Sequence, residues 1–385
     1  MKPVEPEFTL GIEEEYLLVD RRTRALAAEP PQSLLGECEE EVGKQVSSEL
    51  QRSQIEVGTR VCHSLQDVRD ELMRLRKSVI EVTARHGLAP IAASTHPFSS
   101  WFHQKQTQKE RYEMLTAEMQ AAARRLVICG MHVHVGIDDE ELRIDLMNQL
   151  TYFLPHLLAM SCSSPFWGGH DTGFKSYRLT IFDALPRTGI PERFQSFAEY
   201  RRHIDLLIDA GLIEDSTKIW WDLRPSGRYP TLETRVMDVC TRLDDAIALS
   251  ALLVCILRML YRLRVSNQRW RIYSPLLIKE NRWRAMRYSF DEGLLDLGRG
   301  RVVPFEVLLD ELLHLVEDDA QALGCTREVA SLEEILKRGT SAHRQLDAYR
   351  SAQAAGADRD ESLEAVVDLL VSDTAAGLDA PADNR

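Results

Sequence analysis

Three consecutive glutamates, Glu13-Glu14-Glu15, stand near the start of the chain. The residues around them alternate between two faces, which predicts a β-strand over residues 7–20. Adjacent acids repel each other and glutamate is a poor strand former, so something must offset the repulsion. Glu13 and Glu15 share one strand face about 7 Å apart, a spacing that suits carboxylates binding neighbouring Mg²⁺ ions. A solvated strand face is the alternative.

A second acidic pair lies in residues 46–58, which also resemble a strand, with an interruption. Glu56 stands between Ile55 and Val57, so its acid is again inside a strand-like run. Glu49 precedes it by seven residues, roughly 23 Å along an unbroken strand. Both acids could serve one site only if the chain bends between them. A surface pair is the alternative, and it is stronger for Glu49 than for Glu56.

Two histidines alternate with apolar residues in the predicted strand 126–137, so His132 and His134 share one face. An H-x-H strand can bind zinc, but zinc also requires a third and often a fourth ligand, and no obvious partner is near in sequence. A neutral imidazole that hydrogen-bonds phosphate or substrate is an equal alternative. A purely structural sheet histidine is the favoured alternative for one of the two.

An acid and a base, Glu233 and Arg235, stand two residues apart in the predicted strand 231–238. The loop before them carries Arg224 and Arg228. This arrangement fits a metal-bridged phosphate held by guanidinium groups. A structural salt-bridge network is the alternative.

The elements that must position these residues alternate along the chain. The patterns predict further strands at 89–93 and 217–223, and helices at 65–82, 107–125, 141–160, 195–210 and 244–265. Residues 162–195, rich in glycine and proline, form a predicted long loop, which in a compact protein usually has a function. Ser331 with Glu334 predicts a helix capping box. The mixture favours one α+β domain over residues 1–350, built on a mainly antiparallel sheet.

Composition excludes some classes of function. The chain has 385 residues, 47 basic and 60 acidic, and a formal net charge of −13. This argues against a nucleic-acid protein held by general phosphate attraction, but it leaves room for a small anion at a locally basic site. Residues 351–385 hold eight acids and two bases, so they carry nearly half of the net charge. They form a predicted acidic C-terminal segment with a disordered end.

Cysteine and hydropathy patterns predict a cytoplasmic protein with no membrane partner. The seven cysteines are scattered and none forms a CxxC pair, which fits a reducing compartment rather than a disulfide framework or a structural zinc site. The N-terminal residues contain no apolar core of a signal peptide. The apolar run 246–257 is shorter than the roughly 20 residues that a membrane span needs.

The usual glycine-rich phosphate loops are missing from the sequence. It contains no GxxxxGK[ST] loop, no GxGxxG after a strand and no GxSxG elbow. If a nucleotide binds, metals and arginines must therefore hold its phosphates.

Seven motifs occur in one order and together carry a resemblance. They are G-I-E-E-E-Y at 11–16, S-T-H-P-F at 94–98, G-M-H-V-H-V-G at 130–136, S-Y-R at 176–178, W-W-D-L-R-P at 220–225, L-E-T-R-V-M-D at 232–238 and E-N-R-W-R-A at 280–285. Over about residues 7–350 the chain resembles the YbdK-type carboxylate–amine ligases of the glutamate–cysteine ligase type 2 family. The resemblance implies a glutamine-synthetase-like catalytic fold, in which a curved, mainly antiparallel sheet is backed by helices.

The resemblance also implies a reaction. A substrate carboxylate attacks the γ-phosphate of ATP, and an amine then displaces phosphate from the acyl phosphate to form an amide. The implied cofactors are ATP and two or three Mg²⁺ ions, which neutralise the phosphates. The implied partners are a small carboxylate and a small amine, and a homo-oligomer is expected at family level. Family members are associated with weak glutamate–cysteine ligase activity. The loop 162–195 becomes a candidate lid that excludes water.

Site roles follow from the resemblance position by position. It implies metal binding by Glu13, Glu15, Glu56 and Glu233, with Glu49 as a less secure partner. It implies catalytic roles for His132, near the phosphates, and for Arg235, which would stabilise charge on the transferred phosphoryl group. Substrate or nucleotide binding is assigned to Arg178, Arg224, His134 and Tyr177. One departure is Arg287-Tyr288-Ser289, where a smaller, glycine-containing turn is expected.

Three rival functions stay open. The first is a metal-dependent hydrolase built on His132 and His134, which would bind zinc tightly and have no affinity for ATP. The second is a guanidine phosphotransferase on the same fold, which would form a phosphorylated guanidine and no free phosphate. The third is a non-catalytic binding protein that retains the fold.

Overall fold

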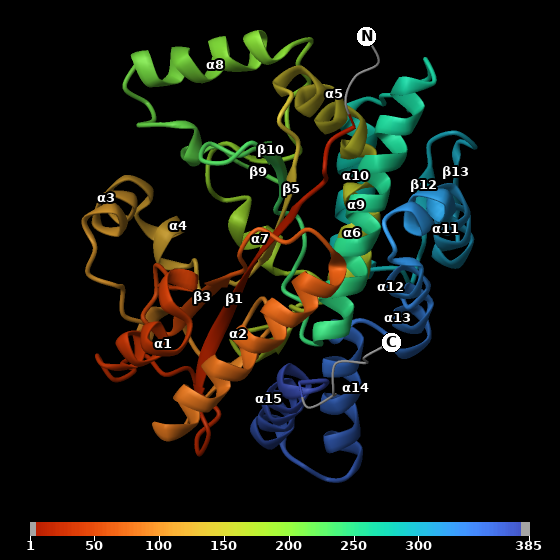
Figure 1. Cartoon of the computed structure of the whole chain (residues 1–385). Coiled ribbons are helices and arrows are strands. Elements are labelled where there is room, and N and C mark those ends of the chain that lie inside the picture. Colours follow the sequence, from red (N-terminus) through yellow and green to blue (C-terminus); the bar gives the residue numbers. More distant parts are fainter. Residues whose placement is uncertain (1–4, 379–385) are drawn as a thin grey trace.

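An antiparallel sheet carries the acidic and histidine motifs. The computed structural model describes residues 5–378, and within them the sheet has the strand order β10-β11-β5-β1-β3-β2, with β4 also paired to β1 (Figure 1). Its strands are β1 Leu10–Asp20, β2 Val46–Ser48, β3 Gln54–Gly58, β4 Leu88–Ile91, β5 Met131–Gly136, β10 Leu223–Pro225 and β11 Thr231–Thr234. The predicted strand 46–58 is therefore two strands, β2 and β3, that pair as a hairpin.

Helices surround this sheet and make up much of the chain (Figure 1). They are α1 Leu34–Val42, α2 Leu65–Arg85, α3 Glu110–Met119, α4 Ala121–Arg124, α5 Glu140–Leu150, α6 Leu154–Ser161, α7 Arg178–Phe182, α8 Phe197–Asp209, α9 Leu243–Val265, α10 Pro275–Tyr288, α11 Phe305–Ala322, α12 Thr326–Ala330, α13 Leu332–Arg338, α14 Ser341–Ala354 and α15 Arg359–Ala375. Short strands β6 Phe166–Trp167, β7 His170–Asp171, β8 Thr188–Gly189, β9 Trp220–Trp221, β12 Leu294–Asp296 and β13 Arg301–Val303 form three small pairs. Single 3₁₀ turns are η1 Gly43–Gln45, η2 Trp101–His103, η3 Thr151–Phe153 and η4 Ser216–Lys218.

The middle glutamate of the first motif faces the helical layer. Glu14 is fully buried, and Arg76 of α2 binds it through two bonds of 2.6 and 2.8 Å. The Tyr16 hydroxyl donates a third bond to the same carboxylate at 2.5 Å. Arg76 also donates to the carbonyls of Cys240 and Thr241, which tie α2 to the segment before α9. One acid of the three is thus neutralised behind the sheet, which leaves Glu13 and Glu15 on the opposite face.

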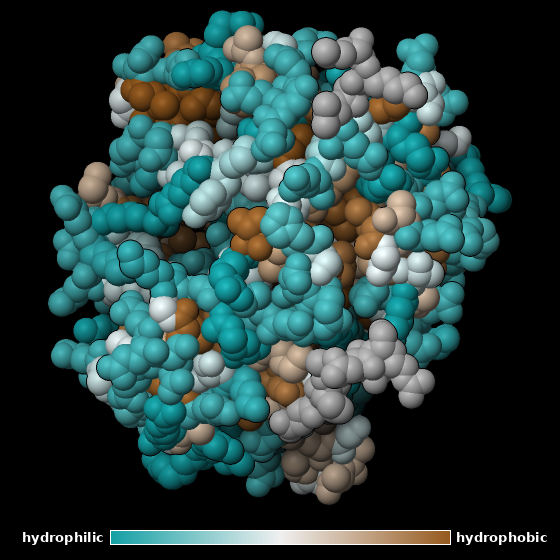
Figure 2. Space-filling view, in the orientation of Figure 1, coloured by the Kyte–Doolittle hydropathy of each residue, from teal (hydrophilic) through white to brown (hydrophobic). Residues whose placement is uncertain are grey.

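The long apolar helix α9 belongs to the core. Its 23 residues are enough, by length and composition, to cross a membrane, and 83% of the most apolar window is buried inside the protein. It packs against α2, α5, α6 and α11. The molecular face in Figure 2 is mainly hydrophilic with scattered hydrophobic patches.

Several predicted elements need correction. The helix predicted over 107–125 is broken into α3 and α4 at Gln120, which has a positive φ of 50°. The loop predicted over 162–195 contains β6, β7, α7 and β8, and Asp238 accepts hydrogen bonds from Ser164 and Ser176 within it. The capping box predicted at Ser331 is wrong. This residue has helical backbone angles, which prevent the capping geometry, and its hydroxyl donates to the carbonyl of Glu328.

The described part of the acidic C-terminal segment is mostly helical. α14 continues through residue 350, and α15 packs against α14 and β4. The Thr374 hydroxyl accepts from the backbone N–H of Ala92, and Asp368 pairs with Arg24 at 3.1 Å. The predicted disordered end falls mainly on residues 379–385, which lie outside the described residues.

Candidate active site

Strand register places the motif residues on one sheet face. Glu13 of β1 lies opposite His132 of β5, and His134 of β5 lies opposite Glu233 of β11. On the other side of β1, Glu15 lies opposite Glu56 of β3. Directly opposed residues of antiparallel strands point to the same face, so motifs that are far apart in sequence converge there.

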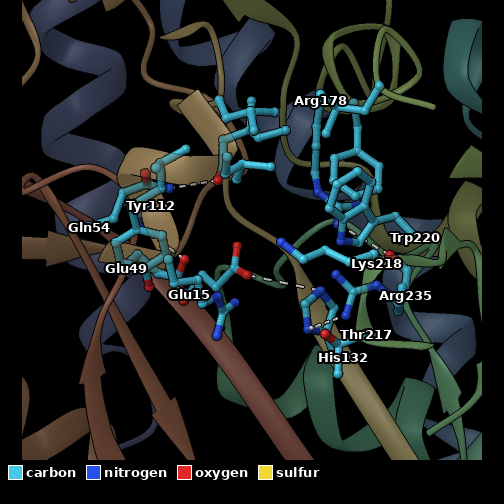
Figure 3. Close-up of a pocket in the computed structure, with 17 residues that line it drawn as sticks. Glu15, Glu49, Gln54, Tyr112, His132, Arg178, Thr217, Lys218, Trp220 and Arg235 are labelled. Atoms are coloured by element: carbon cyan, nitrogen blue, oxygen red, sulfur yellow. Dashed lines mark hydrogen bonds and ion pairs between the residues drawn. The ribbon is translucent and has the colours of Figure 1, made fainter. Parts of the chain in front are cut away.

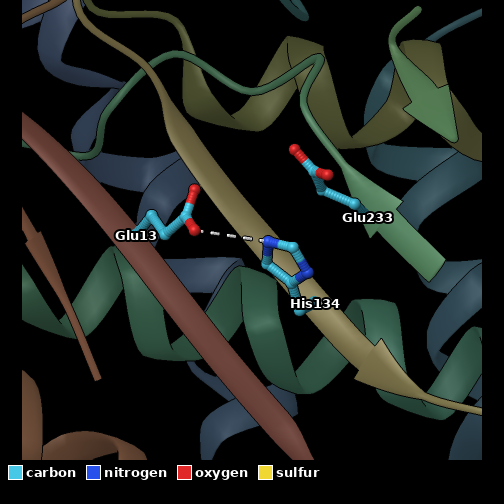
Figure 4. A group of neighbouring side chains, drawn as sticks. All are labelled: Glu13, His134 and Glu233. Carbon is cyan, nitrogen blue, oxygen red and sulfur yellow. Dashed lines mark ion pairs between the residues drawn. The ribbon is translucent and has the colours of Figure 1, made fainter. Parts of the chain in front are cut away.

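Glu13, His134 and Glu233 form the first of two candidate cation sites, hereafter the balanced group. Their ligand atoms lie within 4.8 Å of one another (Figure 4). His134 Nε2 is 3.6 Å from a Glu13 oxygen, and its Nδ1 bonds to the Thr231 hydroxyl at 2.9 Å. Within the described chain, Nε2 is buried and has no hydrogen-bond partner. An imidazole oriented by its other nitrogen, with a free nitrogen facing two carboxylates, fits a cation.

Arginines supply positive charge to the balanced group. Arg224 binds Glu233 with both branches of its guanidinium, at 2.9 and 3.1 Å, and Arg235 binds the same carboxylate from the neighbouring strand position. Burial raises the pKa of Glu233, but Arg235 and Arg224 outweigh burial and hold it well below its usual range. Burial likewise opposes ionisation of Glu13, and the neighbouring imidazoles of His132 and His134 lower its pKa overall. Both carboxylates are therefore ionised without a metal.

Glu15, Glu49 and Glu56 form the second candidate cation site, hereafter the acidic group, with carboxylate oxygens within 4.8 Å of one another. Burial and the charge of Glu56 raise the pKa of Glu15 to about 7. Burial and the charge of Glu15 raise the pKa of Glu49 to about 7. Burial and the charge of Glu49 raise the pKa of Glu56 well above its usual range. Three crowded carboxylates that resist ionisation are the donor set that a hard divalent cation would satisfy.

The bend that Glu49 requires is present. β2 ends at Ser48 and β3 begins at Gln54, and the intervening turn brings Glu49 back toward Glu56. The structure thus brings together all five predicted metal-binding residues, but in two groups. His134, predicted to bind substrate or nucleotide, belongs to the balanced group. The metal-binding role of the five glutamates and the binding role of His134 stay predictions.

His132 and Arg235 lie between the two groups. His132 Nδ1 is 3.1 Å from Glu13 and 3.4 Å from an Arg235 nitrogen, and its Nε2 is 4.0 Å from Glu15. Burial and the charge of Arg235 lower the pKa of His132 to about 4, so its imidazole is neutral near pH 7. A neutral imidazole and a guanidinium therefore face the space between two candidate cation sites.

Arg178 is turned largely toward the backbone. Its guanidinium donates to the carbonyls of Arg235 and Met237, each at 3.2 Å, and so fixes the chain that follows β11. Gly130 is needed beside it, because a Cβ there would lie 2.4 Å from an Arg178 nitrogen. Arg178 also lines the cavity beside the acidic group, so a substrate in that cavity could contact it as predicted.

Two other predicted binding residues are partly or wholly occupied elsewhere. Besides Glu233, Arg224 donates to the carbonyls of Thr217 and Ile219. The Tyr177 ring lies 6.0 Å from Trp167 and 6.2 Å from Phe174. Tyr177 is not among the described residues that line the cavity beside the acidic group, and its predicted role stays a prediction.

That cavity is open to solvent and reaches from the acidic group to Arg235 (Figure 3). Sequence reasoning missed several of its polar residues. Gln54, whose side chain donates to the Ile128 carbonyl at 2.6 Å, was accessible from strand periodicity, because it stands two residues before Glu56. Tyr112 of α3 and Lys218 of η4 carry no local signal, since they come from segments outside the sheet.

A second, more open hollow comes near the balanced group at one lining residue, Tyr229. It is bordered by the segment 225–230, by α8 and by the start of α5. The Tyr229 ring is edge-on to the His134 ring, with 6.1 Å between the ring centroids. Glu15 and Glu49 of the acidic group line the first cavity, whereas Glu13, His134 and Glu233 are not among the described residues that line the second hollow.

Residues 9–368 match the family model described as glutamate–cysteine ligase family 2. The chain belongs to this family. The similarity predicted from the seven motifs is confirmed, and the protein is accordingly an ATP-dependent carbon–nitrogen ligase. A Rhodospirillum rubrum protein named "Putative glutamate--cysteine ligase 2" is 60% identical over 382 residues, 98% of each chain. A Jannaschia protein with the same name is 54% identical over 366 residues, 95% of this chain and 96% of its own.

Solved structures of this family's fold are more distant in sequence. A glutamate–cysteine ligase from Francisella tularensis, in complex with AMP, superposes with a TM-score of 0.67 at 13% identity, covering 98% of this chain and 91% of its own. A bifunctional glutathione synthetase from Pasteurella multocida gives a TM-score of 0.68 at 16% identity, covering 95% of this chain and 52% of its own. These likenesses concern the fold, and the predicted glutamine-synthetase-like α+β fold is confirmed.

Proposed function

We propose that the protein joins a carboxylic acid to an amine through an acyl phosphate formed with Mg-ATP. The observation that carries this proposal is the pair of candidate cation sites on one sheet face, with His132 and Arg235 between them. Phosphoryl transfer from ATP to a carboxylate brings negative charges together, and catalysis depends on positioning and charge stabilisation.

The donor sets fit bound cations. Glu15, Glu49 and Glu56 would hold one Mg²⁺ through oxygen alone, and Glu13, His134 and Glu233 would hold another. When bound, the ions neutralise phosphate charge and polarise the transferred phosphoryl group. The orphaned Nε2 of His134 and the raised pKa values of the acidic group support this assignment.

The protein's own residues then have distinct tasks. Arg235 presents a guanidinium, anchored by Glu233, to the point where charge develops on the transferred phosphoryl group. His132 stays neutral and holds a single ring proton between Glu13, Arg235 and the cavity. Arg178 fixes the carbonyls of residues 235–237 and so orients Arg235.

The two openings suggest where the substrates lie. The nucleoside of ATP would occupy the side of Tyr229, next to the balanced group. The acid would occupy the cavity that contains Glu15 and Glu49. Their reacting ends meet beside His132 and Arg235.

An ADP-release assay with hydroxylamine tests the proposal, because an acyl phosphate is trapped as a hydroxamate whatever the natural amine is. We expect ADP, phosphate and hydroxamate to form together, and to require both Mg²⁺ and an added acid. Glu13→Gln should abolish all three products, and Glu40→Gln, at an exposed position of α1, should leave them unchanged. Glutamate with cysteine is the first natural pair to assay.

Three results would overturn the proposal. Full turnover of Glu13→Gln would show that the assigned site is wrong. Tightly bound zinc with no ATP affinity would favour the hydrolase built on His132 and His134, and a phosphorylated guanidine without free phosphate would favour the phosphotransferase.

A further inference from the structure

One arginine of the motif at 280–285 is buried and bound on two sides by carboxylates. Arg282 of α10 is 7% exposed. Its guanidinium donates to Asp222 at 2.5 and 3.1 Å and to Asp183 at 2.6 and 2.9 Å. Asp183 directly follows α7, and Asp222 lies between β9 and β10. A single side chain of α10 thus joins two separate segments of the chain.

Both of these segments hold the backbone of Arg235. The sheet pairing of β11 ends at Thr234, so Arg235 is the first residue beyond it. The carbonyl of Asp222 accepts the N–H of Arg235 at 2.8 Å. Arg178, the first residue of α7, donates to the carbonyl of Arg235 at 3.2 Å. The peptide N–H and the carbonyl of Arg235 are therefore both held by segments that Arg282 ties together.

Burial limits how far this network can move. Asp222 is 2% exposed, and its own N–H donates to the carbonyl of Gly189, in the segment 162–195, at 2.8 Å. A buried carboxylate is costly without a partner, and a guanidinium binds it in one fixed geometry. A group that stabilises developing charge must lie within about 0.5 Å of its productive position. A buried, doubly paired arginine beside the backbone of Arg235 is suited to that precision.

We propose that Arg282 is a positioning residue for Arg235. Through Asp222 it fixes the peptide N–H of Arg235, and through Asp183 it fixes the helix whose Arg178 holds the carbonyl. The inference rests on the proposed function, in which the guanidinium of Arg235 stabilises charge on the transferred phosphoryl group. It gives a task in the reaction to a motif whose residues are not among those that line the cavity or form the two candidate cation sites.

Asp222→Asn is the first test, because it keeps the carbonyl that binds Arg235 and removes the charge that binds Arg282. The hydroxylamine assay is run with Mg-ATP and an acid that the wild-type protein turns over. We expect kcat to fall by roughly 10- to 100-fold, since a small displacement of a catalytic group is costly. KM for ATP should stay close to the wild-type value, because Arg235 acts on charge that develops during the reaction. Full kcat in a folded Asp222→Asn variant would overturn the inference.

A second buried network offers a matched control. Asp319 of α11 is fully buried and accepts from Arg258 and Arg262 of α9, each at 2.8 Å. Asp319→Asn therefore removes the same kind of charge and should lower the thermal unfolding temperature, as Asp222→Asn does, but leave kcat unchanged. Both variants are assayed well below their unfolding temperatures. Equal losses of kcat in the two variants would show that the effect is general destabilisation.

A double-mutant cycle tests whether Asp222 acts through Arg235. In the Arg235→Lys background, Asp222→Asn should lower kcat much less than it does in the wild-type background, because the group that it positions is already gone. Losses that simply add would overturn the inference. Should Asp222→Asn not fold, Asp183→Asn replaces it, since that carboxylate is partly exposed and its loss leaves Arg282 paired with Asp222. It should lower kcat in the same way but less, and full kcat in its place would also overturn the inference.

The wild-type protein separates this inference from the proposed function. If it forms no ADP and hydroxamate with any acid, the proposed function is wrong and the role of Arg282 falls with it. If it turns over normally and the Asp222 and Arg235 variants give additive losses, the role of Arg282 alone is wrong.

Discussion

Two groups of three side chains share one sheet face but differ in how their charge is offset. In the balanced group, Arg224 and Arg235 hold Glu233 ionised before any metal arrives. In the acidic group, Glu15 and Glu49 have pKa values of about 7, because burial and neighbouring carboxylates oppose their charge. The protein alone thus preorganises one site, and the other depends on a cation for its stability.

This difference suggests a division of labour in the proposed reaction. The balanced group contacts, through His134, the Tyr229 ring that lines the opening assigned to ATP, whose phosphates would bring their own cation. The acidic group faces the cavity assigned to the acid, where a resident cation would counter the incoming carboxylate. His132 and Arg235 lie at the junction, so a change there should affect both sides.

The largest expected effect is loss of turnover in Arg235→Lys. Lysine keeps the charge but loses the planar fork that binds Glu233 and that, in the proposed reaction, would also reach the transferred phosphoryl group. We expect kcat to fall by roughly 10³-fold, with a much smaller change in KM for ATP. Single-turnover measurement of ADP formation checks this. A loss confined to KM would place Arg235 in ground-state binding.

The second prediction concerns stability, and its sign differs between the groups. In metal-free protein at pH 8, Glu233→Gln should lower the free energy of unfolding by about 3 kcal/mol, because it leaves two buried arginines unpaired. Glu56→Gln should raise the free energy of unfolding by about 1 kcal/mol. The pKa of Glu56 is higher in the folded protein than in the unfolded chain, so ionisation of Glu56 opposes folding increasingly as pH rises. Urea unfolding with EDTA measures both values. The same sign for both variants would remove the distinction between the groups.

Strand periodicity explains which site residues could be predicted from the sequence. A period of two places Glu13 and Glu15 together, and likewise His132 and His134, whatever the rest of the fold. The partner of Glu14 could not be predicted, because Arg76 reaches it from a helix far along the chain. The division of five predicted ligands into two groups also depends on strand register, which local pattern does not fix.

Site residues on loops and helices were harder to predict, because local sequence pattern does not show which distant segments meet in the fold. Lys218 and Tyr112 enter the cavity from η4 and α3, and neither has a sequence neighbour that marks it. The expected glycine-containing turn after the tryptophan motif is more informative. Ser289 occupies a positive φ of 56°, a conformation that favours glycine, and its buried hydroxyl donates to the Ala159 carbonyl. Ser289 thus adopts the positive-φ conformation for which a glycine was expected.

The third prediction uses Mg²⁺ alone as a probe of the acidic group. Saturating Mg²⁺ should raise the stability of the wild-type protein, by about 2.7 kcal/mol at one hundred times Kd. Glu49→Gln should weaken this Mg²⁺ response by about tenfold in affinity, and Glu40→Gln on exposed α1 should not. Thermal unfolding across a Mg²⁺ titration measures the effect. An unchanged response in Glu49→Gln would mean that the cation binds elsewhere.

The fourth and smallest effect is a pH dependence that belongs to neither group. His96, in the motif at 94–98, accepts the backbone N–H groups of Phe98 and Ser99 at Nδ1 and donates from Nε2 to the Arg24 carbonyl. Burial lowers its pKa to about 4, from 6.5 in the unfolded chain. The neutral form therefore stabilises the fold above pH 6.5, and this contribution is lost as pH falls toward 4.

Between pH 6.5 and 5.5, His96 alone should remove about 1 kcal/mol from the free energy of unfolding. His96→Asn cannot titrate, so its stability should fall less over this interval, although it is lower at pH 7. The two variants of the second prediction, Glu233→Gln and Glu56→Gln, should both retain the wild-type contribution of His96, since that side chain bonds to neither group. Urea unfolding at the two pH values tests this, and parallel curves for wild type and His96→Asn would show that His96 is not held neutral. The His96 contribution is then the background against which pH effects at the two carboxylate groups are measured.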